Sequence, residues 1–432
     1  MNMFTRRGLV GLTAGLMAMT GMVGIAMAQQ TNLTLFSPND QAAVAYTEAM
    51  VAAFEAANPD ISVEIEVGPG GTERDNMVKS RLATGSMSDV FVYNTGSLFQ
   101  AINPAQTTVD LSNEPYMSTI LDSFKQTVTA TDGTLRGVPY GQAMGGGVLY
   151  NKKVYEELGL SVPTTWDGFM ANNVKIKEAG KAPVIQTFGD TWTSQLFVLA
   201  DYYNVQAVEP DFAARYTANE AKYAGNSAAM GGFQKQADVF NAGDLNEDFG
   251  AAVLDDGLRM LAQGEGAHYP MLTFAVGTIA QNYPDLVNDV GFFALPGDDA
   301  AKNGTTVWMP TALYISANSP NLEAAKKLVA FVGSKEGGCD PWVEINAITG
   351  PFLIQGCELP ADVPAAVTDL QTYFTADGRT APALEFLSPV KGPSLENITV
   401  EVGSGIRTPE DAAALYDEDV KKQAQQLGLP GW

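Results

Sequence analysis

The spacing of apolar residues changes twice within residues 32–71, and this change constrains the fold more than any other feature of the sequence. Leu33 and Leu35 alternate with polar residues, as in a β-strand. The apolar residues then recur at helical spacing through Tyr46 and Met50, and they alternate again across residues 61–67. A strand, helix and strand of this length normally form a parallel crossover unit. The beginning of the chain therefore predicts an α/β architecture.

The following segment extends this pattern. A second helix is predicted over residues 72–86, and it leads to an apolar strand in "DVFVYNTGS", residues 89–97. Strands that alternate with helices indicate a lobe built on a mainly parallel sheet. In such sheets ligands lie beyond the carboxyl ends of the strands. Three loops rich in Gly, Ser, Thr, Asn and Asp follow the three strands, and they are either a ligand site or ordinary turns: "SPNDQ", "GPGGTERD" and "YNTGS".

The first 28 residues have the parts of a secretory signal peptide. Arg6 and Arg7 precede an uncharged apolar run that ends in Ala26-Met27-Ala28. A membrane anchor is the alternative, but several glycines lower the hydrophobicity of the run. We therefore expect cleavage after Ala28 and a periplasmic location. Residues 5–9 also resemble a twin-arginine signal, so the export route stays open between that pathway and Sec.

Length and charge limit the organisation of the chain and its partners. The residues after Ala28 are too numerous for one ordinary core and suit two lobes of roughly 200 residues each. The whole chain carries a net charge of −24, and the signal peptide contains two basic residues but no acidic residue. Nucleic acids and anionic membranes require clusters of Lys and Arg on the protein surface. We therefore expect neither as a partner.

The chain has two cysteines, Cys339 and Cys357. In an exported protein an even pair normally forms a disulfide, which would close this short loop and stabilise the fold by about 3 kcal/mol. A metal site is a weaker interpretation because thiolate sites usually recruit further Cys or His ligands. Two free buried thiols are the third alternative.

No residue pattern marks a catalytic site. The single histidine, His268, has no acidic residue or second histidine at metal-binding spacing, so it is more typical of a histidine with structural hydrogen bonds. The sequence contains no nucleophile elbow, phosphate-binding loop or calcium-binding loop. Acidic residues are numerous, but no two of them stand out as a glycosidase pair. We predict no catalytic residue, metal or cofactor, and a periplasmic glycan-acting enzyme is the alternative of a different class.

Several aromatic residues lie beside small polar residues. An aromatic face next to hydroxyl and amide groups suits a ligand that has both C–H faces and hydroxyl groups, as a sugar does. Packing in the core is the alternative, above all for Phe36 and Phe274. The residues concerned are Phe36, Tyr93, Trp192, Phe274 and Trp308.

The segment "GVPYGQAMGGGVLYNKKVYEELGLSVPTTWDGF", residues 137–169, resembles the signature region of the extracellular solute-binding proteins of ABC importers, in the family typified by maltose-binding protein. The matching features are Val138-Pro139, Tyr150-Asn151-Lys152, Gly159, Pro163 and Thr165-Trp166. Further segments are similar in the same order, at residues 85–102, 264–274, 289–297 and 312–337. Three positions depart from the family pattern: Ser88 replaces Pro, His268 replaces Met and Phe274 replaces Trp.

The resemblance implies a two-lobe periplasmic-binding-protein fold of type II, in which each lobe is a mainly parallel sheet flanked by helices. The expected N-terminal lobe comprises residues 29–142 plus 297–337, and the C-terminal lobe comprises residues 143–296 plus 338–432. The strand "GFFALPG", residues 291–297, would be the second crossing between the lobes. The first crossing would bend at Gly145, Gly146 and Gly147, although close packing of the strand also accounts for these glycines.

The resemblance further implies a monomer that captures a sugar or oligosaccharide between two closing lobes and delivers it to a membrane permease. A polyol or a polyamine is the alternative ligand for the same fold. We expect carboxylates to accept hydrogen bonds from hydroxyl groups and aromatic rings to stack on the sugar. The predicted ligand-binding residues are Asn39, Asp40, Thr72, Tyr93, Asn94, Thr95, Ser97, Gln142, Asp190, Trp192, Phe274 and Trp308.

Overall fold

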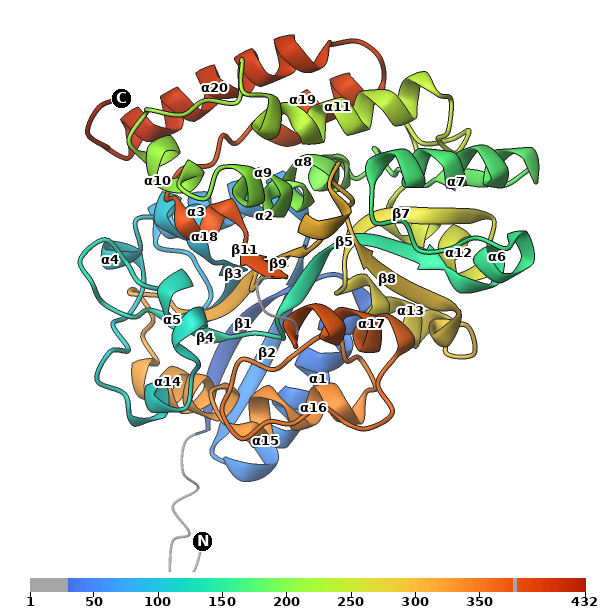
Figure 1. The fold of residues 1–432 in the computed structure, drawn as a ribbon. Helices are drawn as coiled ribbons and strands as arrows, with labels where there is room; N and C mark the ends of the chain where they lie inside the picture. The colour runs from blue at the N-terminus through green and yellow to red at the C-terminus, as the bar shows by residue number, and fades with distance from the viewer. Residues whose placement is uncertain (1–29, 376–378) are drawn as a thin grey trace, which may run out of the picture.

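The computed structural model describes residues 30–375 and 379–432, and it shows two β-sheets that are each packed with helices (Figure 1). We call each sheet with its helices a half of the molecule. The predicted signal peptide lies outside the described residues. Among the helices of the described part, none is long and apolar enough to cross a membrane.

The first sheet has the strand order β2-β1-β3-β10-β4. Three strands are parallel, namely β1 (Thr31–Pro38), β2 (Ile61–Gly68) and β3 (Val90–Asn94). Between β3 and β4 (Gly137–Pro139), β10 (Thr311–Ile315) pairs antiparallel with both. Helix α1 (Gln41–Ala57) connects β1 to β2, and α2 (Gly71–Thr84) connects β2 to β3. The crossover unit predicted from the change in spacing is therefore confirmed.

The remaining helices of the first half are short, except for one that packs on the sheet. Helix α14 (Leu322–Val332) contacts β1, β4 and β10. The others are α3 (Gly96–Ala101), α4 (Pro104–Thr107), η1 (Pro115–Ser118), α5 (Asp122–Thr127), α15 (Lys335–Gly338) and α16 (Asp340–Glu344).

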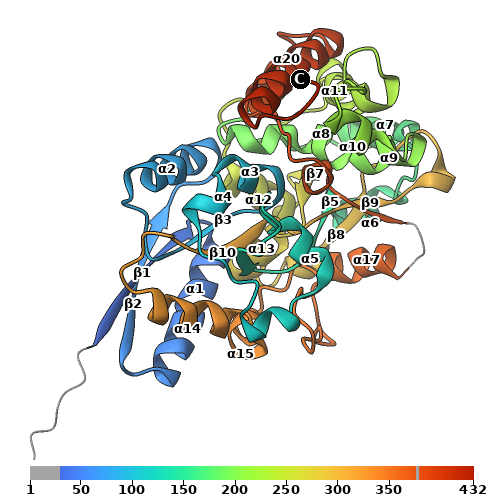
Figure 2. The ribbon, with the colours of Figure 1, turned by 90° about the vertical axis from the view of Figure 1, so that its left-hand side faces the viewer.

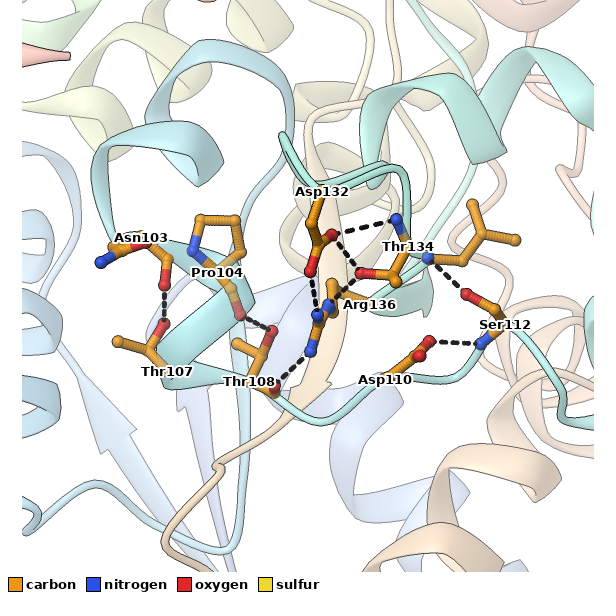
Figure 3. Close-up of polar contacts among 10 residues, drawn as sticks. Asn103, Pro104, Thr107, Thr108, Asp110, Ser112, Asp132, Thr134 and Arg136 are labelled. Carbon is orange, nitrogen blue, oxygen red and sulfur yellow. Dashed lines mark hydrogen bonds and ion pairs between the residues drawn. The ribbon is translucent and has the colours of Figure 1, made fainter. Parts of the chain in front are cut away.

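A buried arginine fixes the chain just before β4 (Figure 3). The Arg136 guanidinium donates to the Thr108 carbonyl oxygen at 2.8 Å and to Asp132 at 2.7 Å. It thereby ties the turn around Asp132 to the segment that follows α4. Strand β4 begins directly after Arg136, so this network anchors the chain just before residues 140–143, which join β4 to β5 and form the first crossing between the halves.

The second sheet has the strand order β11-β9-β5-β7-β6, and β8 also pairs with β5. Its bounds are β5 (Met144–Asn151), β6 (Ala182–Val184), β7 (Gly266–Leu272), β8 (Val290–Ala294), β9 (Thr305–Trp308) and β11 (Thr380–Pro382). The central strand β5 runs antiparallel to β7, β8 and β9, and only the two edge pairs are parallel. The expectation of a mainly parallel second sheet was therefore wrong. Its central strand, β5, is the first strand of this sheet along the chain. The strands beside it, β7, β8 and β9, all run in the opposite direction.

The helices of the second half include a group at the top of Figure 1, where α11, α19 and α20 pack around a shared core. Figure 2 shows α11 and α20 at the end of the molecule away from α1, α14 and α15. The bounds are α6 (Lys152–Leu158), α7 (Trp166–Glu178), η2 (Thr191–Gln195), α8 (Leu196–Ala200), α9 (Tyr202–Val208), α10 (Phe212–Thr217), α11 (Ser227–Asn241), α12 (Leu254–Gln263), α13 (Ala275–Asn282), η3 (Val287–Asp289), η4 (Ala300–Lys302), α17 (Ala365–Phe374), α18 (Leu384–Leu387), α19 (Leu395–Gly403) and α20 (Pro409–Gln426).

The chain crosses between the halves at places that differ from the predicted boundaries. Residues 291–297 were expected as the second crossing, yet β8 lies within the second sheet. Strand β9 follows it into the same sheet, because it pairs with the three residues of β5 that β8 leaves free. The second crossing comes only at residues 309–310. Conversely, Trp342 and residues 347–348 belong to the core of the first half, although residues 338–432 were predicted in the C-terminal lobe. The division into two moving lobes stays a prediction.

The three glycines at the expected hinge lie inside β5. A Cβ atom added to Gly146 would lie 2.1 Å from Cζ3 of Trp308, and one added to Gly147 would lie 2.4 Å from the Phe293 carbonyl oxygen. At Gly145 the nearest atom would be Cδ1 of Leu370, at 2.4 Å. None of the three has a positive φ angle. Close packing against β8, β9 and α17 therefore accounts for the glycines, and their role in bending stays a prediction.

The two cysteines form a disulfide, which confirms the first of the three alternatives. The Cα atoms of Cys339 and Cys357 lie 6.3 Å apart, which is within the usual range for a disulfide. The bond closes a loop that runs from α16 back toward the second half.

Candidate ligand-binding site

A cavity of about 560 Å³ is lined by residues of both halves. The first half contributes the ends of β1 and β3 and the beginning of α2. The second half contributes η2, the ends of β7 and β9, and the segment from α18 to α19. Pockets for small molecules usually measure about 300–1,000 Å³. The cavity lies where the loops after the parallel strands converge, as the sequence predicts.

Eight of the twelve predicted site residues line this cavity. They are Asp40, Thr72, Tyr93, Asn94, Gln142, Trp192, Phe274 and Trp308. Their contacts with a ligand stay a prediction, but the structure brings them together from seven separate segments of the chain. Phe36, which was considered with the other aromatic residues, is instead fully buried below the Arg74 guanidinium.

The other four predicted residues do not line the cavity. Asn39 is exposed beside it. The Thr95 hydroxyl donates to the Met309 carbonyl oxygen at 2.7 Å, and Ser97 is buried within α3. Asp190 accepts a hydrogen bond from the Leu254 N–H at 2.7 Å, so its carboxylate caps the first turn of α12. These side chains have structural surroundings that the loop composition did not reveal.

The first half contributes a polar wall that is anchored by backbone hydrogen bonds. Asp40 caps α1 by accepting a hydrogen bond from the Ala43 N–H at 3.0 Å. Burial raises the pKa of the Asp40 carboxyl, while the Ala43 hydrogen bond and the charge of Arg74 oppose that increase. Burial lowers the pKa of Arg74 to about 10, so the guanidinium remains charged at neutral pH. Its two NH groups donate to the carbonyl oxygens of Ser37 and Val92.

The second half contributes an aromatic wall. The half-buried rings of Trp192 and Phe274 lie 5.9 Å apart, centroid to centroid, at an interplanar angle of 41°. Gly71 faces Trp192, and a Cβ atom there would lie 3.2 Å from Cδ1 of the indole. Gly71 also has a φ of 59°, which favours glycine. By contrast, Trp308 is only 2% exposed, and its indole N–H donates to Glu385 at 2.6 Å. Trp192 and Phe274 therefore offer the more accessible ring faces.

Two acidic residues of the site had no signal in the sequence. Glu385 pairs with Lys391 at 3.4 Å, and both line the cavity. Glu396, at the beginning of α19, is 8% exposed and accepts hydrogen bonds from the hydroxyls of Thr72 and Thr191. Thr72 belongs to the first half, so this carboxylate joins the two halves at the rim of the cavity. Residues 385–396 show no apolar period, and their charged residues lie among Pro and Gly, as in many surface loops.

Gln142 lies on the cavity wall within the first crossing and is 2% exposed. Its side-chain oxygen accepts hydrogen bonds from the backbone N–H groups of Thr349 and Gly350. Because backbone N–H groups can only donate, the side-chain atom that faces them must be the oxygen, Oε1, and the amide nitrogen must point the other way. The amide nitrogen, Nε2, has no hydrogen-bond partner among the described residues.

His268 lies away from the cavity, in the core of the second half. Its ring nitrogens pair with the Tyr155 hydroxyl at 2.7 Å and with Oδ1 of Asn173 at 3.0 Å. Burial lowers its pKa to about 3, so the ring is neutral at physiological pH. The prediction of a histidine with structural hydrogen bonds is confirmed. Within residues 30–375 and 379–432, no group of three or more His, Cys, Asp or Glu residues is placed to hold a metal ion.

The fold and the cavity define a two-lobe α/β binding protein of type II. Residues 38–338 match the model of the bacterial extracellular solute-binding proteins, and the chain belongs to this family. The family resemblance carried by residues 137–169 is therefore confirmed.

Curated relatives agree with this assignment, and a solved structure agrees with the fold. The chain is 25% identical to the multiple sugar-binding protein of Streptococcus mutans, over 75% of this chain and 77% of the relative. It is 23% identical to the melibiose/raffinose/stachyose-binding protein MelE of Bacillus subtilis, over 88% of this chain and 87% of the relative. The structure of the SBP RafE in complex with raffinose superposes with a TM-score of 0.73 at 21% identity, covering 92% of this chain and all of that one.

Proposed function

We propose that this protein binds a sugar or oligosaccharide in the cavity between its halves and delivers it to the membrane permease of an ABC importer. The observation that carries the proposal is the composition of the cavity wall. The adjacent rings of Trp192 and Phe274 line the cavity together with the carboxylates of Asp40 and Glu396. The names of the relatives, which describe sugar-binding proteins, support a carbohydrate ligand.

The wall suits the two kinds of surface that a sugar presents. The C–H faces of a pyranose pack on aromatic rings, and its hydroxyl groups donate to carboxylates, which are strong acceptors. Asp40, Thr72, Tyr93, Asn94 and Gln142 would contact the ligand from the first half and the crossing. Trp192, Phe274 and Trp308 would contact it from the second half. No bond of the ligand is broken in this proposal, so we propose a carrier and not an enzyme.

The charges of the cavity favour a neutral ligand over a polyamine. Asp75 pairs with Lys79 at 2.6 Å, and Glu385 pairs with Lys391. These pairs neutralise two of the carboxylates, and the charge of Arg74 lies near Asp40. A polycation would require several unpaired carboxylates around it. A sugar or a polyol fits the remaining acceptors better.

We propose that the two halves close on the ligand, because both halves contribute residues to the cavity wall. A ligand that touches both halves stabilises only the arrangement in which they are close, so binding shifts the population toward that arrangement. Thr72 and Gly71 of the first half already contact Glu396 and Trp192 of the second half. We propose that β5, with Gly145, Gly146 and Gly147, carries part of the bending. The protein would act as a monomer in the periplasm after removal of residues 1–28.

A thermal-shift screen of residues 29–432 tests the ligand class. A ligand of the folded state at 100 times its Kd stabilises the protein by about 2.7 kcal/mol and therefore raises Tm. The panel includes raffinose, stachyose, maltose and chito-oligosaccharides, with mannitol and spermidine as representatives of the other classes. We expect a rise in Tm with at least one sugar, and we expect Trp192→Ala to reduce it to about half or less.

The matched control is Trp432→Ala, because Trp432 packs on Tyr216 and Lys222 and does not line the cavity. This variant should keep the sugar response of the wild type. A rise in Tm with spermidine or mannitol alone would contradict the carbohydrate proposal and leave the fold unaffected.

A further inference from the structure

The loop closed by the disulfide links both halves of the molecule. We call residues 339–357 the return loop, because they lead the chain from α16 in the first half toward α17 in the second. In the first half, the Trp342 ring stacks on Tyr46 of α1, with centroids 4.2 Å apart and an interplanar angle of 9°. In the second half, the Gln281 side chain of α13 donates to the Ile345 carbonyl oxygen. The return loop therefore contacts both α1 and α13.

The return loop also holds the first crossing. The Ala143 N–H donates to the Pro351 carbonyl oxygen at 2.8 Å, and the Gly350 N–H donates to Oε1 of Gln142 at 3.1 Å. The approach is close, since a Cβ atom on Gly350 would lie 2.0 Å from the Ala143 carbonyl oxygen. Two segments that pass between the halves are thus hydrogen-bonded to each other at this point.

The same contacts shape the cavity. Trp342, Thr349 and Gln142 all line it. Because the return loop supplies every hydrogen bond that Oε1 of Gln142 accepts, the loop also sets the direction of the unpartnered Nε2 group. A shift of the return loop would therefore displace three neighbouring parts of the wall together.

Little regular structure holds the return loop in place. Its only helix is α16, with five residues, and Asn346 has a φ of 54°. Its strand-like contacts are two isolated β-bridges, Phe352 with Gln142 and Ile354 with Ile120. Segments with few regular hydrogen bonds open locally more often than strands and long helices do. The disulfide joins the two ends of this segment, and Cys339 is only 2% exposed. A covalent link at this position limits how far the loop can move away from the crossing.

We propose that the Cys339–Cys357 disulfide is a positioning element of the ligand cavity. It holds the return loop against residues 142–143, so that Gln142, Trp342 and Thr349 keep their places in the wall. This inference rests on the proposed function for its effect on binding, but the order of the loop is measurable without any ligand.

Hydrogen exchange of the ligand-free protein tests the first half of the inference. The variant Cys339→Ser/Cys357→Ser removes the bond and nearly preserves side-chain size. We expect the amides of Ala143, Thr349 and Gly350 to exchange about tenfold faster by local opening, as expected for the loss of roughly one hydrogen bond's stabilisation. Amides of α7 that also exchange by local opening should stay unchanged. Val420→Ala is the control, because it opens a cavity in the core around α20 and lowers Tm without touching the return loop.

The reduced wild-type protein provides a second route if the serine variant does not fold. Dithiothreitol transfers two electrons and two protons to the cystine sulfurs and closes to its own cyclic disulfide. The same three amides should then exchange faster. Unchanged exchange in the folded protein without the bond, or an equal change in Val420→Ala, would overturn the inference.

Titration with raffinose tests the second half. The protein without the disulfide should bind raffinose at least about fivefold more weakly than the wild type, from the loss of one well-placed hydrogen bond, and Val420→Ala should bind as the wild type does. Faster exchange with unchanged raffinose affinity would also overturn the inference. If raffinose does not bind the wild-type protein, raffinose is not its ligand. In that case the exchange result alone decides whether the disulfide holds the loop.

Discussion

Thr72→Val provides a sharp test of closure, because Thr72 and Thr191 donate to the same oxygen of Glu396 from different halves. Thr72 lies in α2 of the first half, while Thr191 lies in η2 of the same half as Glu396. Opening the cavity would break the bond from Thr72 and leave the bond from Thr191 intact. Only the bond from Thr72 therefore contributes to the free-energy difference between the open and closed arrangements.

The expected magnitude follows from the surroundings of this bond. A hydrogen bond to a charged group contributes about 1.5–3 kcal/mol, but the Thr72 side is exposed and Glu396 keeps its second donor, so we take about 1 kcal/mol. This value corresponds to a roughly fivefold change in Kd. Thr72→Val should raise the Kd for the sugar found in the thermal screen by about this factor, whereas Thr191→Val should leave it nearly unchanged.

Isothermal titration calorimetry of the wild type and both variants measures the difference. Fluorescence energy transfer between one dye on each half should show a smaller closed population for Thr72→Val than for Thr191→Val in the ligand-free protein, where the proposed contact of Thr72 with the sugar does not contribute. Equal affinities for the two variants would refute the reasoning, since a bond that differs between the two arrangements must affect the equilibrium between them.

Three further predictions follow from single sites. Trp192→Ala should weaken sugar binding at least about tenfold, while Trp192→Phe should keep part of the affinity because a ring face remains; calorimetry compares them. Gly146→Ala should lower the free energy of unfolding in urea by about 1–3 kcal/mol, because its Cβ atom would lie 2.1 Å from Trp308 and force the core to shift. The pKa of His268 is about 3 in the folded state and near 6.5 when unfolded, so its contribution to stability is complete above pH 6.5 and is lost as the pH falls toward 3. Between pH 7.5 and pH 5 the wild type should therefore lose about 2 kcal/mol more stability than His268→Gln, as measured by urea titration at each pH, and an equal loss would contradict this explanation.

The first half of the fold could be predicted from local sequence patterns because its first strands and helices alternate along the chain. The change in spacing between Leu33 and residue 67 is sufficient to define β1, α1 and β2. The second sheet could not be predicted in this way. The partners of β5 come from residues 266–308, more than a hundred residues later, and no local period encodes an antiparallel pairing at that distance.

The candidate site was predictable where it follows regular elements. Asn94 lies at the end of β3, and Asp40 and Thr72 lie at the beginning of helices, where loops of an α/β sheet converge. Polar loop residues that cap a helix or bond to the backbone, as Asp190 and Thr95 do, are of the same types as ligand-binding residues, so the sequence does not distinguish the two roles. Glu396 could not be predicted as a site residue, because its place at the cavity depends on a tertiary hydrogen bond with Thr72.

The central claim is that the cavity between the halves binds a carbohydrate. Isothermal titration calorimetry of residues 29–432 against the sugar panel tests it most directly, with Trp192→Ala and Trp432→Ala measured in parallel. The account predicts one-to-one binding of at least one sugar, weakened at least about tenfold in Trp192→Ala and unchanged in Trp432→Ala. Binding of spermidine or mannitol with no heat from any sugar, or sugar binding that is unaffected by Trp192→Ala, would contradict it.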